Sequence, residues 1–161
     1  MPTVTGVVVA AVFTTGAMAQ DGQTLAEMPV GDVSFLGVPI APGTLAAGAE
    51  IYTARCAACH GAKLEGQPDW KRRLANGRMP APPHDASGHT WHHSDQDLFE
   101  ITKGGLAAVL PDYESDMPAF GAQLSDADIT AVLAFIKSTW PERQRGFQAE
   151  VTENAMAAEA P

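Results

Sequence analysis

The chain has two cysteines, Cys56 and Cys59, which stand two residues apart, and His60 follows them directly. A disulfide between them would close a very short loop, and the stabilisation that a disulfide gives increases with the length of the loop. A structural cross-link is therefore a poor explanation for the pair. The spacing indicates that the two thiols react with or bind another group. If a group is bound there, the rest of the chain must fold around it.

The run Cys56-Ala57-Ala58-Cys59-His60 is the C-x-x-C-H pattern of covalent c-type haem attachment. At the end of a helix, thiols at positions i and i+3 share one face, so they can reach the two vinyl groups of one porphyrin. The histidine then lies beneath the iron, and the two small alanines let the ring approach the backbone. One such motif predicts one haem.

Two other uses of a C-x-x-C pair stay open from the residues alone. A thioredoxin-like dithiol requires a preceding strand in a βαβ pattern, and the chain shows no such pattern. A zinc site requires a second pair of ligands, which the segment 89–93 would supply.

Four histidines, His84, His89, His92 and His93, lie close together in the sequence around Trp91. Histidine is the commonest ligand of transition metals, so a copper site in this segment is a second possibility. The segment is polar and bounded by glycine and proline. We therefore expect these side chains to border the haem and its propionates rather than to hold a metal of their own.

Three segments are predicted to be helices: Thr44–Cys56, Ser94–Lys103 and Ser125–Trp140. The first and the last have the 3.6-residue apolar period of an amphipathic helix, and the middle one is ended by Gly104 and Gly105. Each begins at a hydroxyl residue suited to cap a helix N-terminus, and Pro141 ends the last one. Few β-branched runs occur outside the N-terminus, so we expect no strands. Long loops rich in proline and glycine separate the helices, which is typical of a small domain wrapped around a bound group. The pattern predicts an all-α fold.

The termini carry their own signals. Residues 1–19 are predicted to be an export signal peptide, because the apolar run 7–13 precedes small residues that suit cleavage. That run is shorter than the ~20 residues that span a bilayer, although an uncleaved signal would act as an anchor. We expect an extended leader at 20–43, the folded domain at 44–140 and a charged, partly helical tail at 141–161.

The formal net charge of the 161-residue chain is −9. Nucleic-acid binding requires clustered Lys and Arg that neutralise phosphates, so this charge argues against a nucleic-acid partner. It also argues against docking on an anionic membrane surface.

Over about residues 44–140 the chain resembles the class I c-type cytochromes, small bacterial proteins with one haem. Cys56, Cys59 and His60 match the attachment motif of this family. The resemblance implies the small cytochrome c fold, with three to five helices wrapped around one covalently bound haem c. In that fold the first and last helices cross closely at a glycine and an aromatic side chain. Gly48 would occupy that contact, which explains a glycine inside a helix, where it costs about 1 kcal/mol relative to alanine.

At the crossing, the aromatic positions of the family correspond to Tyr52 and Phe135. The resemblance also assigns Pro68 and Trp70 to the haem pocket. The carbonyl of Pro68 would accept a hydrogen bond from the ring of His60, and Trp70 stands where the family more often has leucine.

The second iron ligand implied by the resemblance is Met117, opposite His60. Met79 is the other methionine within the domain, and each is followed by proline. The chain between His60 and either methionine is long enough to pass around a porphyrin, so reach alone does not decide. The resemblance favours Met117, because it precedes the last helix at a family-like interval.

The resemblance further implies a periplasmic electron carrier rather than an enzyme. Its partners would be redox proteins that donate and accept electrons, such as membrane respiratory complexes, and no small-molecule substrate is expected. Two alternatives stay open: a cytochrome subunit of a larger redox complex, and a haem protein that binds small ligands or copper.

Overall fold

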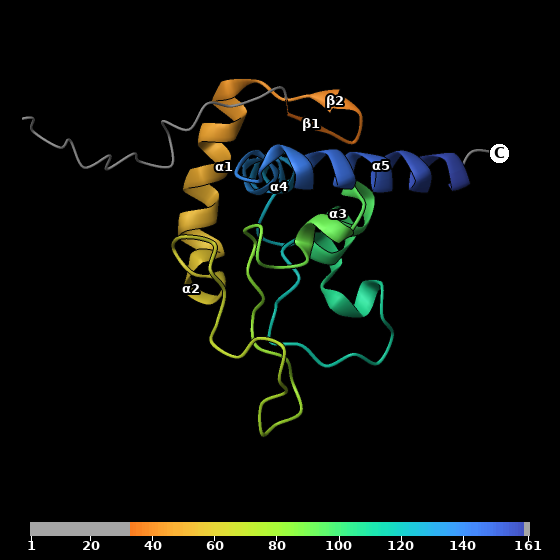
Figure 1. Cartoon of the computed structure of the whole chain (residues 1–161). Coiled ribbons are helices and arrows are strands. Elements are labelled where there is room, and N and C mark those ends of the chain that lie inside the picture. Colours follow the sequence, from red (N-terminus) through yellow and green to blue (C-terminus); the bar gives the residue numbers. More distant parts are fainter. Residues whose placement is uncertain (1–32, 160–161) are drawn as a thin grey trace, which may run out of the picture.

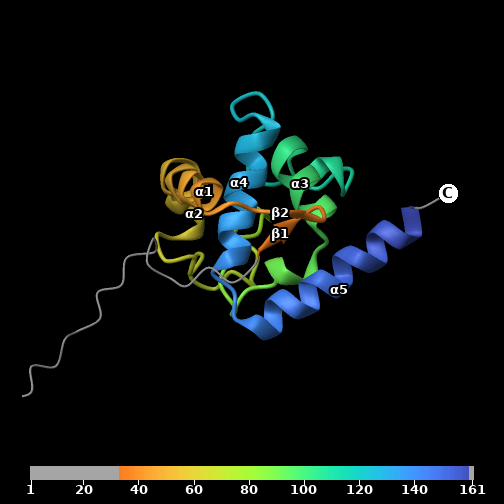
Figure 2. The ribbon, with the colours of Figure 1, turned by 90° about the horizontal axis from the view of Figure 1, so that it is seen from above.

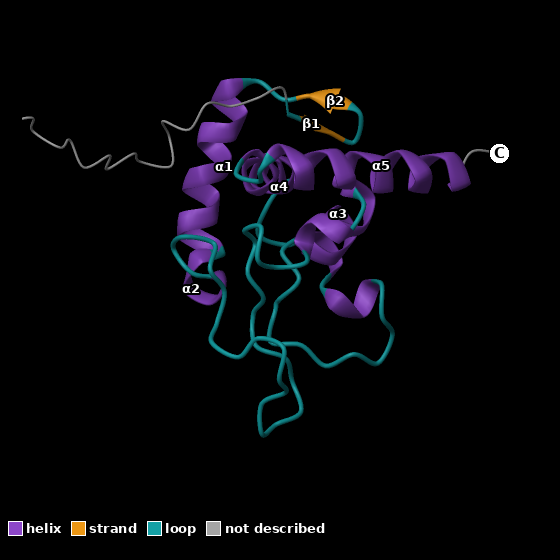
Figure 3. Cartoon of the chain, viewed as in Figure 1, coloured by secondary structure: helices purple, strands orange, loops and turns teal. Residues whose placement is uncertain are grey.

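The computed structural model describes residues 33–159, with the helices gathered on one side and long loops on the other (Figures 1 and 3). The described α-helices are α1 (Pro42–Arg55), α2 (Ala57–His60), α3 (Asp95–Gly104), α4 (Asp126–Ser138) and α5 (Glu142–Glu159). The shorter elements are the 3-10 helices η2 (Thr90–His92) and η3 (Leu106–Ala108) and the strands β1 (Ser34–Phe35) and β2 (Val38–Pro39). This architecture confirms the predicted small cytochrome c fold. The predicted export signal, 1–19, and residues 20–32 of the predicted leader lie outside the described residues.

The core is centred on α4, which lies between α1 and α3 (Figure 2). The crossing with α1 occurs at Gly48, where an added Cβ would lie only 2.1 Å from the carbonyl oxygen of Ala131 and 2.9 Å from the Cβ of Phe135. One turn later the ring of Tyr52 packs on that of Phe135, with centroids 5.7 Å apart. The close helix crossing predicted for Gly48, Tyr52 and Phe135 is therefore confirmed.

The serine caps of the last two predicted helices are also confirmed. The hydroxyl of Ser94 accepts a hydrogen bond from the N–H of Asp97 at 3.0 Å, and Ser125 accepts one from Asp128 at 3.2 Å. Each aspartate reaches back to the N–H of its serine, completing a capping box. Helix α1 begins earlier than expected, at Pro42, because the fixed φ of proline suits the first helical turn.

The expectation of no strands is wrong. Antiparallel β1 and β2 are joined by a two-residue turn at Leu36 and Gly37, whose φ values are +50° and +76°. Positive φ at both turn positions is typical of a type I′ hairpin. The turn is held by a hydrogen bond of 2.8 Å from the N–H of Leu36 to the carboxylate of Asp95, and Phe35 is buried in the core.

The predicted partly helical tail forms the 18-residue helix α5. Its Gln148 is fully buried and donates a hydrogen bond of 2.7 Å to the carboxylate of Asp95. The ammonium group of Lys137, on α4, lies 3.0 Å from the same carboxylate. The division of the chain at residues 44 and 141 stays a prediction, but the segments on either side of it pack together.

The Gly48 crossing predicts that Gly48→Ala destabilises the protein. The new methyl group would collide with backbone atoms of α4, and overpacking of this kind costs about 1–3 kcal/mol. Gly43, in the first turn of the same helix, has no atom within 4 Å of an added Cβ, so Gly43→Ala should stabilise by about 0.5–1 kcal/mol. Urea unfolding followed by circular dichroism measures both. Equal stability of the two variants would contradict the crossing.

Candidate functional site

The C-x-x-C-H segment forms the junction between α1 and α2. Cys56 caps the C-terminus of α1, and its carbonyl oxygen accepts hydrogen bonds from the N–H groups of Cys59 at 3.1 Å and His60 at 2.9 Å. This tight turn keeps the two thiols on one stretch of backbone beside the histidine. Both cysteines are free; Cys56 is partly buried and Cys59 is exposed.

The protonation of Cys56 bears on what the pair can do. Burial, followed by the nearby Cys59, raises the pKa of Cys56 to about 11. At neutral pH this sulfur is therefore a thiol. Dithiol exchange uses the thiolate, which the surroundings of Cys56 disfavour.

His60 is buried, with 7% of its surface exposed. Its Nδ1 lies 2.9 Å from the carbonyl oxygen of Pro82. Because a carbonyl only accepts, Nδ1 carries the proton and donates it, which leaves the Nε2 lone pair bare. Burial lowers the pKa of His60, against a smaller opposing effect of the Pro82 hydrogen bond, so the ring is neutral. A neutral imidazole with its second nitrogen fixed in this way is the usual form of an iron-binding histidine.

The prediction that the carbonyl of Pro68 accepts the hydrogen bond from His60 is wrong, because the acceptor is the carbonyl of Pro82. At Gly66, where φ is +70°, the backbone turns so tightly that an added Cβ would lie 2.4 Å from the nitrogen of Pro83. The next residue, Gln67, pairs with the second proline segment, residues 80–83. Its N–H donates a hydrogen bond of 2.9 Å to the carbonyl of Ala81. This pairing brings Pro82 to the histidine and leaves Pro68 exposed.

His84 is one of the histidines expected to border the haem, but the sequence did not predict its contact with His60. Its ring stacks on that of His60, with centroids 3.9 Å apart and planes inclined by 21°. It therefore lies on the same side as the proximal histidine and is badly placed to bind the opposite face of a porphyrin. Burial, followed by the nearby His60 and His89, lowers the pKa of His84 well below its usual value, so this ring is also neutral.

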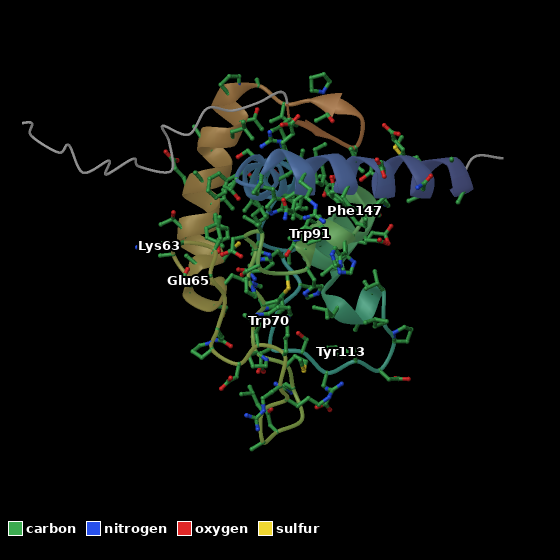
Figure 4. The ribbon with its side chains drawn as sticks, in the orientation of Figure 1. Lys63, Glu65, Trp70, Trp91, Tyr113 and Phe147 are labelled. Carbon is green, nitrogen blue, oxygen red and sulfur yellow. The ribbon has the colours of Figure 1, made fainter. Side chains whose placement is uncertain are left out.

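Trp70 and Trp91 face different surroundings. Trp70 lies among the loops below the helices (Figure 4) and stacks on His89, with centroids 5.4 Å apart and planes inclined by 14°. Trp91 packs against Phe147 of α5 at 5.4 Å. Its indole N–H is buried and has no acceptor within residues 33–159. A carboxylate such as a haem propionate is the kind of acceptor that this N–H lacks.

The two candidate methionines, Met79 and Met117, are both partly buried. Their segments are tied to each other, because the guanidinium group of Arg78 forms an ion pair with Asp116. The contact brings together the loops that carry both sulfur atoms. It does not by itself choose between them.

The remaining histidines contact aromatic side chains and one another, since the rings of His89 and His93 meet edge to face with centroids 5.5 Å apart. His89 stacks on Trp70, whereas His92 packs on Phe147 with centroids 5.6 Å apart. Across residues 33–159, no three side chains of the types His, Cys, Asp and Glu come together in a way that would hold a metal ion.

Comparison with known proteins decides the family. The cytochrome c family pattern matches residues 45–140. The chain belongs to the cytochrome c family. It is similar to cytochrome c6 of Picosynechococcus sp., with 33% identity over 105 residues that cover 65% of this chain and 80% of that protein. No solved structure matches the chain.

This cytochrome therefore carries haem c, and its residues fit the group. The sequence holds one C-x-x-C-H motif, and its thiols, Cys56 and Cys59, are free. His60 presents a bare Nε2 beside them. Trp91 offers a buried N–H that lacks an acceptor among the described residues.

The turn at Gly66 predicts a second test. Gly66→Ala would combine left-handed strain with a collision against Pro82 and Pro83, and so displace the carbonyl that holds His60. Gly77 is the matched control, because its φ is +83° yet no atom lies within 4 Å of an added Cβ.

Gly77→Ala should cost about 1–2 kcal/mol from the strain alone. Gly66→Ala should cost about 1–3 kcal/mol more and shift the reduction potential. Urea unfolding and potentiometry of the haem-loaded protein measure these effects. Equal losses in the two variants would contradict the role assigned to this turn.

Proposed function

We propose that this protein is an exported monohaem cytochrome that carries single electrons, with the haem attached to Cys56 and Cys59 and the iron held by His60 and Met117. The observation that carries the proposal is the hydrogen bond from His60 to Pro82. It fixes the tautomer that binds iron, on a ring that directly follows two free thiols. Family membership supports the same conclusion.

The chain's own residues set how the group behaves. When bound, haem c supplies a one-electron couple between ferric and ferrous iron. Cys56 and Cys59 would hold the ring by two thioether bonds, each formed by adding an S–H across a vinyl group. His60 would donate the Nε2 lone pair, and the Pro82 carbonyl would strengthen that donor through Nδ1. The thioether sulfur of Met117 would favour the reduced iron, so the pair of ligands would raise the reduction potential.

Met117 is favoured over Met79 by the way its loop is held. The loop leaves α3 through η3 and returns to the end of α3, where the N–H of Phe120 donates to the carbonyl of Thr102 at 3.0 Å. The N–H of Met117 also donates to the hydroxyl of Ser115 at 3.0 Å. Fixed ligands keep the reorganisation of the site small during electron transfer. Met79, by contrast, lies in the segment that already supplies Pro82 on the His60 side.

The proposal includes export to the periplasm and electron exchange with redox proteins, such as membrane respiratory complexes. Its support is the predicted signal peptide at residues 1–19. No helix within residues 33–159 has the length and apolar character needed to cross a bilayer. The intact mass of the native protein tests the cleavage, because a retained signal would favour an anchored form.

A cytochrome subunit of a larger redox complex is the second candidate. One observation favours it: α5 lies beyond the matched region 45–140 and exposes Phe147 and Met156, which are 46% and 50% accessible. Purification of the native protein alone, with no co-purifying redox subunit, would argue against this alternative.

Covalent attachment predicts the behaviour of the cysteine variants. Cys56→Ala combined with Cys59→Ala should lose all haem that survives acid-acetone extraction, because no sulfur remains to form a thioether bond. Haem staining after denaturing electrophoresis measures the loss. Cys59→Ala alone is the control and should keep a weaker band through Cys56. A persistent band in the double variant, or one tightly bound zinc in the wild type, would reject the attachment.

The axial assignment predicts opposite results for the two methionines. Met117→Ala should abolish the far-red sulfur-to-iron charge-transfer band of the oxidised protein, lower the reduction potential and open the iron to cyanide and carbon monoxide. Met79→Ala is the matched control and should change these properties little. Absorption spectra and potentiometry measure both. Reversed effects, or a wild type that lacks the band and has two histidines on the iron, would overturn the assignment.

A further inference from the structure

The ring of His60 is restrained from two directions. Pro82 holds one edge, because its carbonyl accepts the Nδ1 proton at 2.9 Å. The ring of His84 covers one face, with centroids 3.9 Å apart and an interplanar angle of 21°. Rotation of the His60 ring about its Cβ–Cγ bond would break the hydrogen bond and also push its edge into the stacked ring.

His84 is itself fixed along its backbone. Its N–H donates to the carbonyl of Leu64 at 2.8 Å. Its carbonyl accepts a hydrogen bond of 2.7 Å from the indole N–H of Trp140. Trp140 follows α4 and is 1% exposed, so this anchor is part of the core. The position of the stacked ring is therefore set by the folded body rather than by a free loop.

The ring of His84 is also fixed in rotation. Its Nδ1 lies 2.9 Å from the hydroxyl oxygen of Thr90. That hydroxyl is 3.3 Å from the carbonyl oxygen of Pro83, which can only accept, so Thr90 donates to Pro83. The hydroxyl oxygen is then left to accept the Nδ1 proton of His84. A partner with a defined tautomer and a locked plane is a rigid surface for His60 to lie on.

We propose that His84 is a positioning residue, which sets the orientation of the His60 imidazole plane and so the electronic asymmetry of the haem iron. The inference rests on the proposed function, because it requires His60 on the iron. Partners around a metal-bound histidine fix its ring orientation, and they tune the metal through it. Residues 82–84 would provide two such partners, the Pro82 carbonyl at the edge of the ring and His84 on its face.

The experiment uses the full-length, haem-loaded protein and compares His84→Leu with His84→Phe. Low-temperature electron paramagnetic resonance and proton NMR of the oxidised form report the imidazole orientation, through the largest g value and the haem methyl shifts. His84→Leu removes the flat ring, so the g feature should broaden and the spread of methyl shifts should change. His84→Phe keeps a flat ring but loses the hydrogen bond to Thr90, so its features should be sharper than those of His84→Leu and broader than those of the wild type. Asn154→Leu is the control, because Asn154 is exposed on α5.

Wild-type spectra in His84→Leu would overturn the inference, as would a His84→Phe variant as broad as His84→Leu. If His84→Leu does not take up haem, Thr90→Val is the deciding variant. It removes the hydroxyl that holds the His84 ring and keeps a side chain of similar size at position 90. Broadening in Thr90→Val supports the inference, and unchanged spectra overturn it. Pyridine haemochrome assays of the same samples distinguish a failure of the proposed function from a failure of the role assigned to His84. A wild type without covalent haem contradicts the proposed function, whereas normal haem with unaltered variant spectra contradicts the role of His84 alone.

Discussion

The crossing of α1 over α4 at Gly48 fixes the attachment motif relative to the residues that anchor His84. The backbones approach so closely that an added Cβ would lie 2.1 Å from the carbonyl oxygen of Ala131. Because α1 ends at Arg55, directly before Cys56, the crossing fixes the attachment motif relative to α4. The end of α4 leads to Trp140, whose indole holds the carbonyl of His84. The two stacked histidines therefore depend on two helices whose relative position is set by one glycine.

A buried carboxylate joins the flanking segments to this helix pair. Asp95 is 1% exposed, and its oxygens accept hydrogen bonds from the N–H of Leu36, the ammonium of Lys137 and the amide of Gln148. Burying a charge is costly unless such donors compensate it. Here the three donors come from the hairpin turn, from α4 and from α5, respectively. The hairpin precedes the family region, residues 45–140, and α5 follows it. The Asp95 side chain therefore connects both flanking elements to the family region.

The sequence predicted those features that depend on near neighbours. The caps at Ser94 and Ser125 require only a residue three positions on, and the C-x-x-C-H motif is contained in five residues. The hairpin escaped prediction because its turn places Leu36, a poor residue for positive φ, in a conformation stabilised by distant Asp95. The acceptor for His60 was misassigned to Pro68 for the same reason. Which proline reaches the histidine depends on the pairing of Gln67 with the second proline segment, and spacing along the chain does not encode that pairing.

The second proline segment, residues 80–83, shows what an irregular, proline-rich backbone can do here that a helix could not. The carbonyls of four successive residues, Ala81, Pro82, Pro83 and His84, accept from the N–H of Gln67 and from the side chains of His60, Thr90 and Trp140. A helix or a sheet would engage these carbonyls with backbone donors. Proline has no N–H and favours an extended backbone without internal hydrogen bonds, so its carbonyls stay free for side chains. The irregular segment is thus the form of backbone that can hold a buried imidazole by its edge and supply a second ring for its face.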